Sequence, residues 1–197
     1  MTADDTRDAG YANRLMSLEG ATWRRLLDVQ RPYRWNLRRQ DLGRTLDVGC
    51  GIGRNLQHLA TGSLGVDHNQ AAVAEARRRG LAAVTVDEFA AAPPAELFDS
   101  LLAAHLMEHL TVNEGKGVIS SYLPFVRAGG KVFFICPQER GYASDSTHVS
   151  FLDDRALRQL AEDLGLTVRQ SFSFPLPRRL GRAFTYNEFC VQAVTPE

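Results

Sequence analysis

The chain of 197 residues carries 23 Lys and Arg against 23 Asp and Glu, which gives a formal net charge of zero. Because nothing in this balance attracts polyanions, a nucleic-acid partner is not expected. No apolar run approaches the ~18 residues that a membrane span needs, and residues 1–10 are too polar for a signal peptide. With three scattered cysteines that suit reduced thiols, we expect a soluble, cytoplasmic protein of one compact domain.

Residues 1–43 precede the first predicted strand, and we expect them to form an N-terminal helical cover. Apolar residues recur at near-helical spacing over 11–28, and Pro32 is expected to end this helix. Arg and apolar residues then alternate over 33–39. A solvated amphipathic cover and a lid over a bound cofactor are both compatible with this segment.

Residues 44–197 alternate short apolar runs with helical patterns. The predicted strands cover 46–48, 64–67, 83–87, 98–105, 131–137, 166–174 and 186–194. The predicted helices cover 55–60, 70–79, a piece after Glu108, 118–126 and 153–164, the last with Asp153 as N-cap. This alternation predicts an α/β fold with a doubly wound, mainly parallel sheet covered by helices on both faces.

A glycine-rich loop follows the first predicted strand. Asp47 comes two residues before Gly49, and Gly51 and Gly53 follow at alternate positions, with Cys50 inside the loop. Glycines let the backbone turn sharply and approach a ligand closely, and the acid suits a ligand that carries an ammonium and a sulfonium. The pattern resembles motif I of the class I S-adenosylmethionine-dependent methyltransferases; an unrelated doubly wound nucleotide-binding domain would also account for it.

Acids also end the second and third predicted strands. An acid at the tip of the second parallel strand can accept both ribose hydroxyls of an adenosine, which is the role expected for Asp67. The resemblance implies a seven-stranded, Rossmann-like sheet whose last strand is antiparallel. It also implies a cofactor site completed by residues after strands two, three and four: His68, Asp87, Glu88, Phe89 and His105.

His105, Glu108 and His109 follow the fourth predicted strand, and His148 follows the fifth. If the chain is helical here, the first three share one face, and with His148 they form a candidate divalent-metal site. The arrangement resembles the metal clusters of the small-RNA 3′-terminal 2′-O-methyltransferases and the ubiquinone-pathway O-methyltransferases, with His105 replacing the first Glu. Magnesium or manganese is the expected ion, and the softer donor set also admits zinc. Alternatively, no metal binds and the histidines line the cleft.

A hydroxyl acceptor needs a base before it can attack the methyl group. We expect His148 to be this base, with His109 second, unless Glu108 and the histidines hold a metal that activates the hydroxyl directly. Glu139, Tyr142, Arg178 and Arg179 are expected to face the substrate, since they follow strands five and six.

These patterns predict an S-adenosylmethionine-dependent O-methyltransferase that acts on a hydroxyl of a small molecule. The chain is similar to small bacterial sugar O-methyltransferases, including those of mycobacterial methylmannose-polysaccharide biosynthesis, which implies a sugar or oligosaccharide acceptor. Carboxyl, amine or phenol acceptors without a metal remain open, as does a homodimer. A non-catalytic cofactor-binding subunit and a zinc peptidase with an inverted His-x-x-Glu-His motif also remain open, although the peptidase leaves the glycine loop unexplained.

Overall fold

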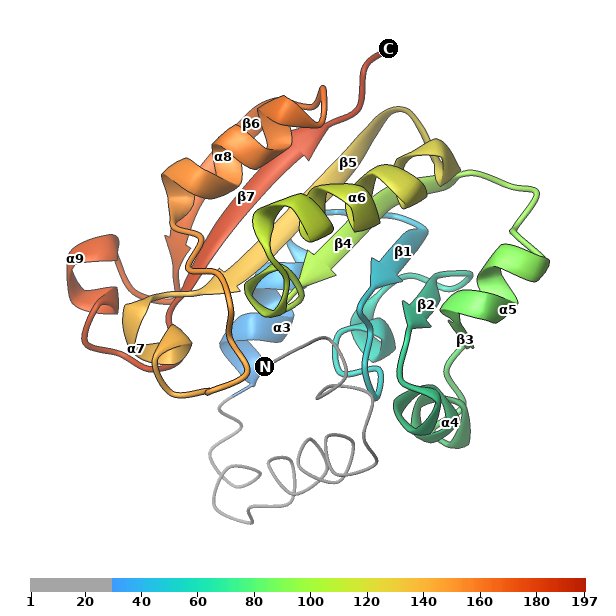
Figure 1. Cartoon of the computed structure of the whole chain (residues 1–197), viewed down its shortest axis with the longest axis horizontal. Coiled ribbons are helices and arrows are strands. Elements are labelled where there is room, and N and C mark those ends of the chain that lie inside the picture. Colours follow the sequence, from blue (N-terminus) through green and yellow to red (C-terminus); the bar gives the residue numbers. More distant parts are fainter. Residues whose placement is uncertain (1–29) are drawn as a thin grey trace.

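The computed structural model describes residues 30–197. The predicted helix at 11–28 lies outside the described residues. Within them, one sheet has the strand order β3-β2-β1-β4-β5-β7-β6, and only β7 runs antiparallel to its neighbours β5 and β6 (Figure 1). This confirms the predicted doubly wound α/β fold with an antiparallel last strand.

The strands are β1 (Thr45–Val48), β2 (Leu64–Asp67), β3 (Ala83–Thr85), β4 (Phe98–Ala104), β5 (Val126–Pro137), β6 (Thr167–Phe174) and β7 (Glu188–Val194). The α-helices are α3 (Arg31–Arg38), α4 (Gln70–Arg78), α5 (Val86–Ala91), α6 (Val112–Tyr122), α7 (Glu139–Tyr142), α8 (Asp154–Asp163) and α9 (Arg178–Gly181). Short 3-10 turns occur at η2 (Leu56–His58), η3 (Met107–His109) and η4 (Leu123–Phe125).

Alternate residues of the central strands face two separate apolar layers. Leu101 and Phe134 belong to the larger cluster, which includes Ile119 of α6 and Leu157 of α8. Their chain neighbours, such as Phe133, belong to a second cluster that includes Leu37 of α3. Successive side chains of a strand point to opposite faces, so this alternation accounts for α6 and α8 in front of the sheet and α3 behind it (Figure 1).

Several predicted boundaries are wrong because capping residues override the apolar pattern. The third strand stops at Thr85, since Thr85 and Glu88 form a capping box that starts α5. A second capping box, of Thr111 and Glu114, starts α6 six residues before the predicted helix at 118–126. The predicted helix at 55–60 is reduced to η2. The N-cap role of Asp153 is confirmed, since its side chain accepts the N–H of Ala156.

Pro32 lies in the first turn of α3, where the missing N–H of proline costs no hydrogen bond. The predicted end of the helix at 11–28 lies outside the described residues. The last strand begins at Glu188, two residues later than predicted.

Candidate functional site

The candidate site lies at the carboxyl edge of the parallel strands, where the strand order reverses between β1 and β4. Ligands of open α/β sheets bind at such a switch point. The glycine loop follows β1, and the His105–His109 segment follows β4. A Cβ added to Gly49 would lie 2.9 Å from Cδ1 of Leu106, so the two segments touch.

The three glycines of the loop adopt positive φ angles. Gly49, Gly51 and Gly53 have φ values of 77°, 52° and 81°, a region that side-chain-bearing residues rarely adopt. Gly49 N–H donates to the carbonyl of Val66 at 2.8 Å. The loop is therefore fixed against β2.

Asp67, at the end of β2, holds this loop in place through hydrogen bonds to its carboxylate. Its Oδ2 accepts the N–H of Gly51 at 2.7 Å, and its Oδ1 accepts the N–H of Asn69 at 2.8 Å. His68 Nδ1 lies 3.5 Å from Asp67 Oδ1. Each carboxylate oxygen has a second lone pair, so Asp67 retains acceptor capacity for a ligand.

Asp47 is buried at the end of β1, and its Oδ2 has no hydrogen-bond partner among the described residues. Burial and the nearby Asp67 raise the pKa of Asp47 to about 7. Burial also raises the pKa of the adjacent Cys50 thiol, with contributions from the same two acids. A buried carboxylate oxygen with no donor among residues 30–197 is unusual, and it is able to accept a hydrogen bond from a cationic or donor group.

Two of the residues after β3 have contacts within the protein. Phe89 is buried and packs edge-on against Tyr122 and Phe125, and Glu88 pairs with Arg77 at 2.5 Å. Their positions beside an adenine stay a prediction. Asp87 is exposed in the first turn of α5, and its predicted role stays a prediction.

The chain after β4 forms a 3-10 turn instead of the expected α-helix. This turn brings Glu108 and His109 next to His148, and ligand atoms of the three lie within 4.8 Å of one another. His105 is not part of this group; it has a φ of 57° at the strand end. The structure thus joins three of the four predicted metal ligands and sets His105 apart.

Hydrogen bonds to Nδ1 define the tautomers of the two histidines. His148 Nδ1 lies 2.7 Å from the carbonyl of Tyr142, and His109 Nδ1 lies 3.2 Å from Thr147 Oγ1 and 3.4 Å from the Thr147 carbonyl. Thr147 donates its hydroxyl proton to Asp145 Oδ1 at 2.8 Å, so its oxygen accepts from His109. In both rings Nδ1 carries the proton, and Nε2 is the basic nitrogen.

Glu108 is only 1% exposed. Burial alone would raise its pKa, but the neighbouring His105 outweighs burial and holds the pKa of Glu108 below its usual value. The Oε1 atom contacts His105 Nδ1 at 3.2 Å, while Oε2 has no hydrogen-bond partner among residues 30–197. The backbone carbonyl of Glu108 accepts the N–H groups of Val149 and Ser150, and these hydrogen bonds fix the loop that carries His148.

Glu188, the first residue of β7, is a site residue that no sequence motif indicates. Its Oε1 lies 2.9 Å from Nε2 of His105. The surrounding protein disfavours the charged imidazole, but hydrogen bonds to Glu108 and Glu188 outweigh this effect and raise the pKa of His105 to about 10. An antiparallel strand starts where its parallel neighbours end, which is the signal that could have identified Glu188.

Three of the four expected substrate residues already have partners within the protein. Arg178 Nη1 donates to Glu139 Oε2 at 2.8 Å, with a second hydrogen bond from Nη2 to Oε1. Tyr142 stacks on His148 with 5.3 Å between ring centroids. Arg179 is exposed on α9. Tyr142 is therefore the residue among these that directly contacts the Glu108–His109–His148 group.

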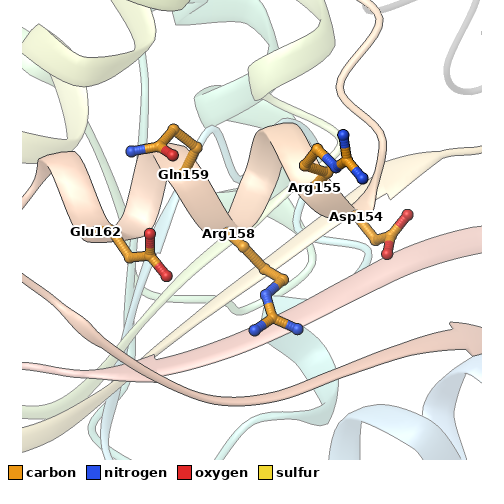
Figure 2. A pocket seen from close by; sticks show the side chains of 5 residues that line it. All are labelled: Asp154, Arg155, Arg158, Gln159 and Glu162. Carbon is orange, nitrogen blue, oxygen red and sulfur yellow. The ribbon is translucent and has the colours of Figure 1, made fainter.

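A separate shallow depression lies on α8, as Figure 2 shows. Its lining residues all come from this one helix: Asp154, Arg155, Arg158, Gln159 and Glu162. A depression formed by one exposed helix face cannot surround a ligand, so it carries no functional assignment.

A family model described as a methyltransferase domain matches residues 20–171. The chain belongs to this methyltransferase family. No curated protein matches the methyltransferase sequence. Among the described residues, no helix is long and apolar enough to cross a membrane.

Solved structures share the fold of this methyltransferase at low sequence identity. One is an S-adenosylmethionine-dependent methyltransferase from Archaeoglobus fulgidus, with 17% identity, a TM-score of 0.64, and coverage of 86% of this chain and 99% of that one. Another is magnesium protoporphyrin IX methyltransferase from Synechocystis with bound S-adenosylmethionine. It has 15% identity, a TM-score of 0.66, and coverage of 98% of this chain and 94% of that one. A third is the N-methyltransferase NodS from Bradyrhizobium japonicum, with 17% identity, a TM-score of 0.64, and coverage of 85% of this chain and 97% of that one.

Proposed function

We propose that this methyltransferase transfers the methyl group of S-adenosylmethionine to a hydroxyl of a small molecule, with a divalent cation at Glu108, His109 and His148. The observation that supports this best is the convergence of these three donors beside the glycine loop. One of them is a buried carboxylate with an oxygen that has no hydrogen-bond partner among residues 30–197.

The β1 edge fits S-adenosylmethionine. Oδ2 of Asp47, which has no hydrogen-bond partner among residues 30–197, suits the ammonium of the methionine part, and Asp67 suits the ribose hydroxyls. The positive φ at Gly51 favours glycine, whose missing Cβ allows close approach of a ligand to the backbone. Structural neighbours with this cofactor or its product bound support the assignment. The bound cofactor supplies an electrophilic methyl group, and the chain's part is to hold the acceptor in line with it.

The β4 edge fits a divalent cation. One nitrogen from each of two imidazoles and one carboxylate oxygen form a three-donor set that leaves coordination positions for a substrate. Manganese, magnesium and zinc all suit such a mixture, and zinc is favoured by imidazole. When bound, the ion acidifies a coordinated hydroxyl.

His148 is the proposed general base if the hydroxyl is not bound to a metal. Its Nδ1 proton is held by the carbonyl of Tyr142 at 2.7 Å, so Nε2 is oriented to accept a proton from the acceptor. His109 is the second choice, because burial lowers its pKa and favours the neutral, basic ring. Each role uses the same nitrogen that would bind a metal, so the two mechanisms exclude each other at a given histidine.

A sugar or oligosaccharide with vicinal hydroxyls is the proposed acceptor. A vicinal diol can chelate a cation, and aromatic faces line the adjoining loops. Tyr142 packs against Phe151 at 5.2 Å between centroids, and Phe151, Phe184 and Tyr186 are at least 37% exposed. Apolar ring faces of this kind suit the flat side of a sugar ring. Glu139, Arg178 and Arg179 are the proposed polar contacts at its edge.

A panel of sugars, catechols, amines and carboxylic acids, assayed with labelled S-adenosylmethionine, tests the proposal. Chelation should remove turnover of the diol acceptor and leave S-adenosylhomocysteine binding nearly unchanged, and Mn²⁺ or Mg²⁺ should restore turnover. Glu108→Gln should behave like chelation, whereas the matched surface variant Glu162→Gln should behave like wild type.

Two outcomes would change the mechanism. Full turnover in chelator combined with an inactive His148→Ala would reject the metal and leave His148 as a simple base. Methylation of an amine or carboxyl, with His148→Ala and Glu108→Gln both fully active, would reject the hydroxyl acceptor and remove this group from the mechanism.

A further inference from the structure

The start of β7 is held rigidly at the carboxyl edge of the sheet. Glu188 pairs in register with Pro137 of β5 on one side and with Phe174 of β6 on the other. The buried Gln138 side chain donates to the Glu188 carbonyl at 3.1 Å, and its backbone N–H donates to the Asn187 carbonyl at 2.9 Å. The backbone at Glu188 therefore has little freedom, and its side chain projects from a fixed point.

His105 lies between two carboxylates. Its Nε2 lies 2.9 Å from Glu188 Oε1, and its Nδ1 lies 3.2 Å from Glu108 Oε1, so each ring nitrogen is within hydrogen-bond distance of a carboxylate oxygen. The His105 backbone N–H donates to the Ile135 carbonyl at 2.9 Å, so the residue is anchored to β5 while its ring reaches across to β7. The ring is about half exposed (46%), so these two hydrogen bonds, and not close packing, fix its orientation.

This chain of hydrogen bonds decides which oxygen of Glu108 is available. Because Oε1 accepts from His105, the carboxylate is turned so that the buried Oε2 is the oxygen without a partner among residues 30–197. Glu108 also belongs to the group with His109 and His148. Residues that hydrogen-bond a metal ligand fix its orientation and strengthen metal binding.

We infer that Glu188 is a positioning residue for the cation site: through His105 it holds Glu108 with Oε2 directed to the ion. This inference rests on the proposed function, because it needs the Glu108–His109–His148 group to bind a cation. It assigns His105 to orienting a ligand instead of binding the metal, and it extends the site to a residue far beyond Glu108 in the chain.

The test is a titration of the full chain with Mn²⁺ alone, followed by electron paramagnetic resonance of the free ion. Glu188→Ala removes the acceptor for His105 and should weaken Mn²⁺ binding by roughly 10- to 100-fold, the range for lost outer-shell partners. Glu188→Gln keeps an oxygen that accepts from His105 Nε2 and should recover most of the affinity. The matched control Glu162→Ala removes an exposed carboxylate of α8 and should bind Mn²⁺ like wild type.

S-adenosylhomocysteine affinity, measured on the same samples, should be unchanged in all variants. Wild-type Mn²⁺ affinity in Glu188→Ala would overturn the inference. So would an equal loss of Mn²⁺ and S-adenosylhomocysteine binding in both Glu188 variants, because Glu188 would then support the whole edge. A wild-type chain that binds no Mn²⁺ would reject the metal site itself. No acceptor is used, so failure to find a hydroxyl substrate leaves this test unaffected.

Discussion

Asp47 offers a test that separates folding from ligand binding. Its pKa is about 7 in the folded protein, because burial and Asp67 disfavour its charge, whereas an unfolded chain has a value of ~3.9. Between these two pKa values the folded state holds a proton that the unfolded chain has lost. The contribution of Asp47 to the free energy of unfolding therefore falls as the pH rises from ~4 to ~7. Above pH 7 the buried charge costs about 4 kcal/mol.

Asp47→Asn removes this charge and should flatten the pH dependence. Relative to wild type, the variant should gain about 2–3 kcal/mol in free energy of unfolding between pH 5 and pH 8.5. Urea unfolding at both pH values measures this. The same variant should bind S-adenosylhomocysteine about 10- to 100-fold more weakly at pH 8, because the ligand ammonium loses a charged acceptor.

Asp99→Asn provides a control of opposite sign. Asp99 accepts the backbone N–H of Arg44 and pairs with Arg127, and these partners hold its pKa below its usual value. Ionised Asp99 therefore contributes to the free energy of unfolding at neutral pH, and this contribution is lost as the pH falls. If wild type and Asp47→Asn keep a constant difference from pH 5 to 8.5, the reasoning about the buried charge is wrong.

Three further predictions concern the two edges of the site. Gly49→Ala places a Cβ 2.9 Å from Leu106 Cδ1 at a φ of 77°, so it should lower the free energy of unfolding, measured in urea, by about 2–4 kcal/mol. Adding Leu106→Ala removes the clash but not the backbone strain at positive φ, so it should restore only part of this loss. Asp67→Ala should weaken S-adenosylhomocysteine binding by about 2–3 kcal/mol in calorimetry, and unchanged affinity would contradict its assigned role. His148→Ala should lower kcat by about 10²- to 10⁴-fold, and an unchanged kcat would exclude it from catalysis.

The fold and the glycine loop could be predicted because their signals are local. Asp47, Gly49 and Gly51 lie within five residues, so the loop is recognisable from one short stretch of sequence. The mainly parallel sheet follows from the alternation of elements, and the antiparallel last strand follows from the family resemblance. The helix starts after Thr85 and Thr111 do not follow from apolar periodicity, because polar capping boxes of the form Thr-x-x-Glu determine them.

The parts of the site that depend on distant pairs could not be predicted from spacing. His105 matches a metal-ligand pattern within its own segment, but its contact with Glu188 joins residues 83 positions apart. Phe89 likewise occupies a position in the chain where an adenine contact is expected, yet packing against Tyr122 and Phe125 takes it into the core. Tertiary contacts decide both positions.

The placement of β7 between β5 and β6 also constrains how the chain is made. Strands β1 to β5 can pair as the ribosome delivers them, but β6 has no place in the sheet until β7, which starts fourteen residues after β6 ends, has been synthesised and has inserted beside β5. Until then β5 presents an open strand edge, a surface prone to association with other chains. The glycine loop can therefore form early in synthesis, whereas the Glu188 contact to His105 has to form late.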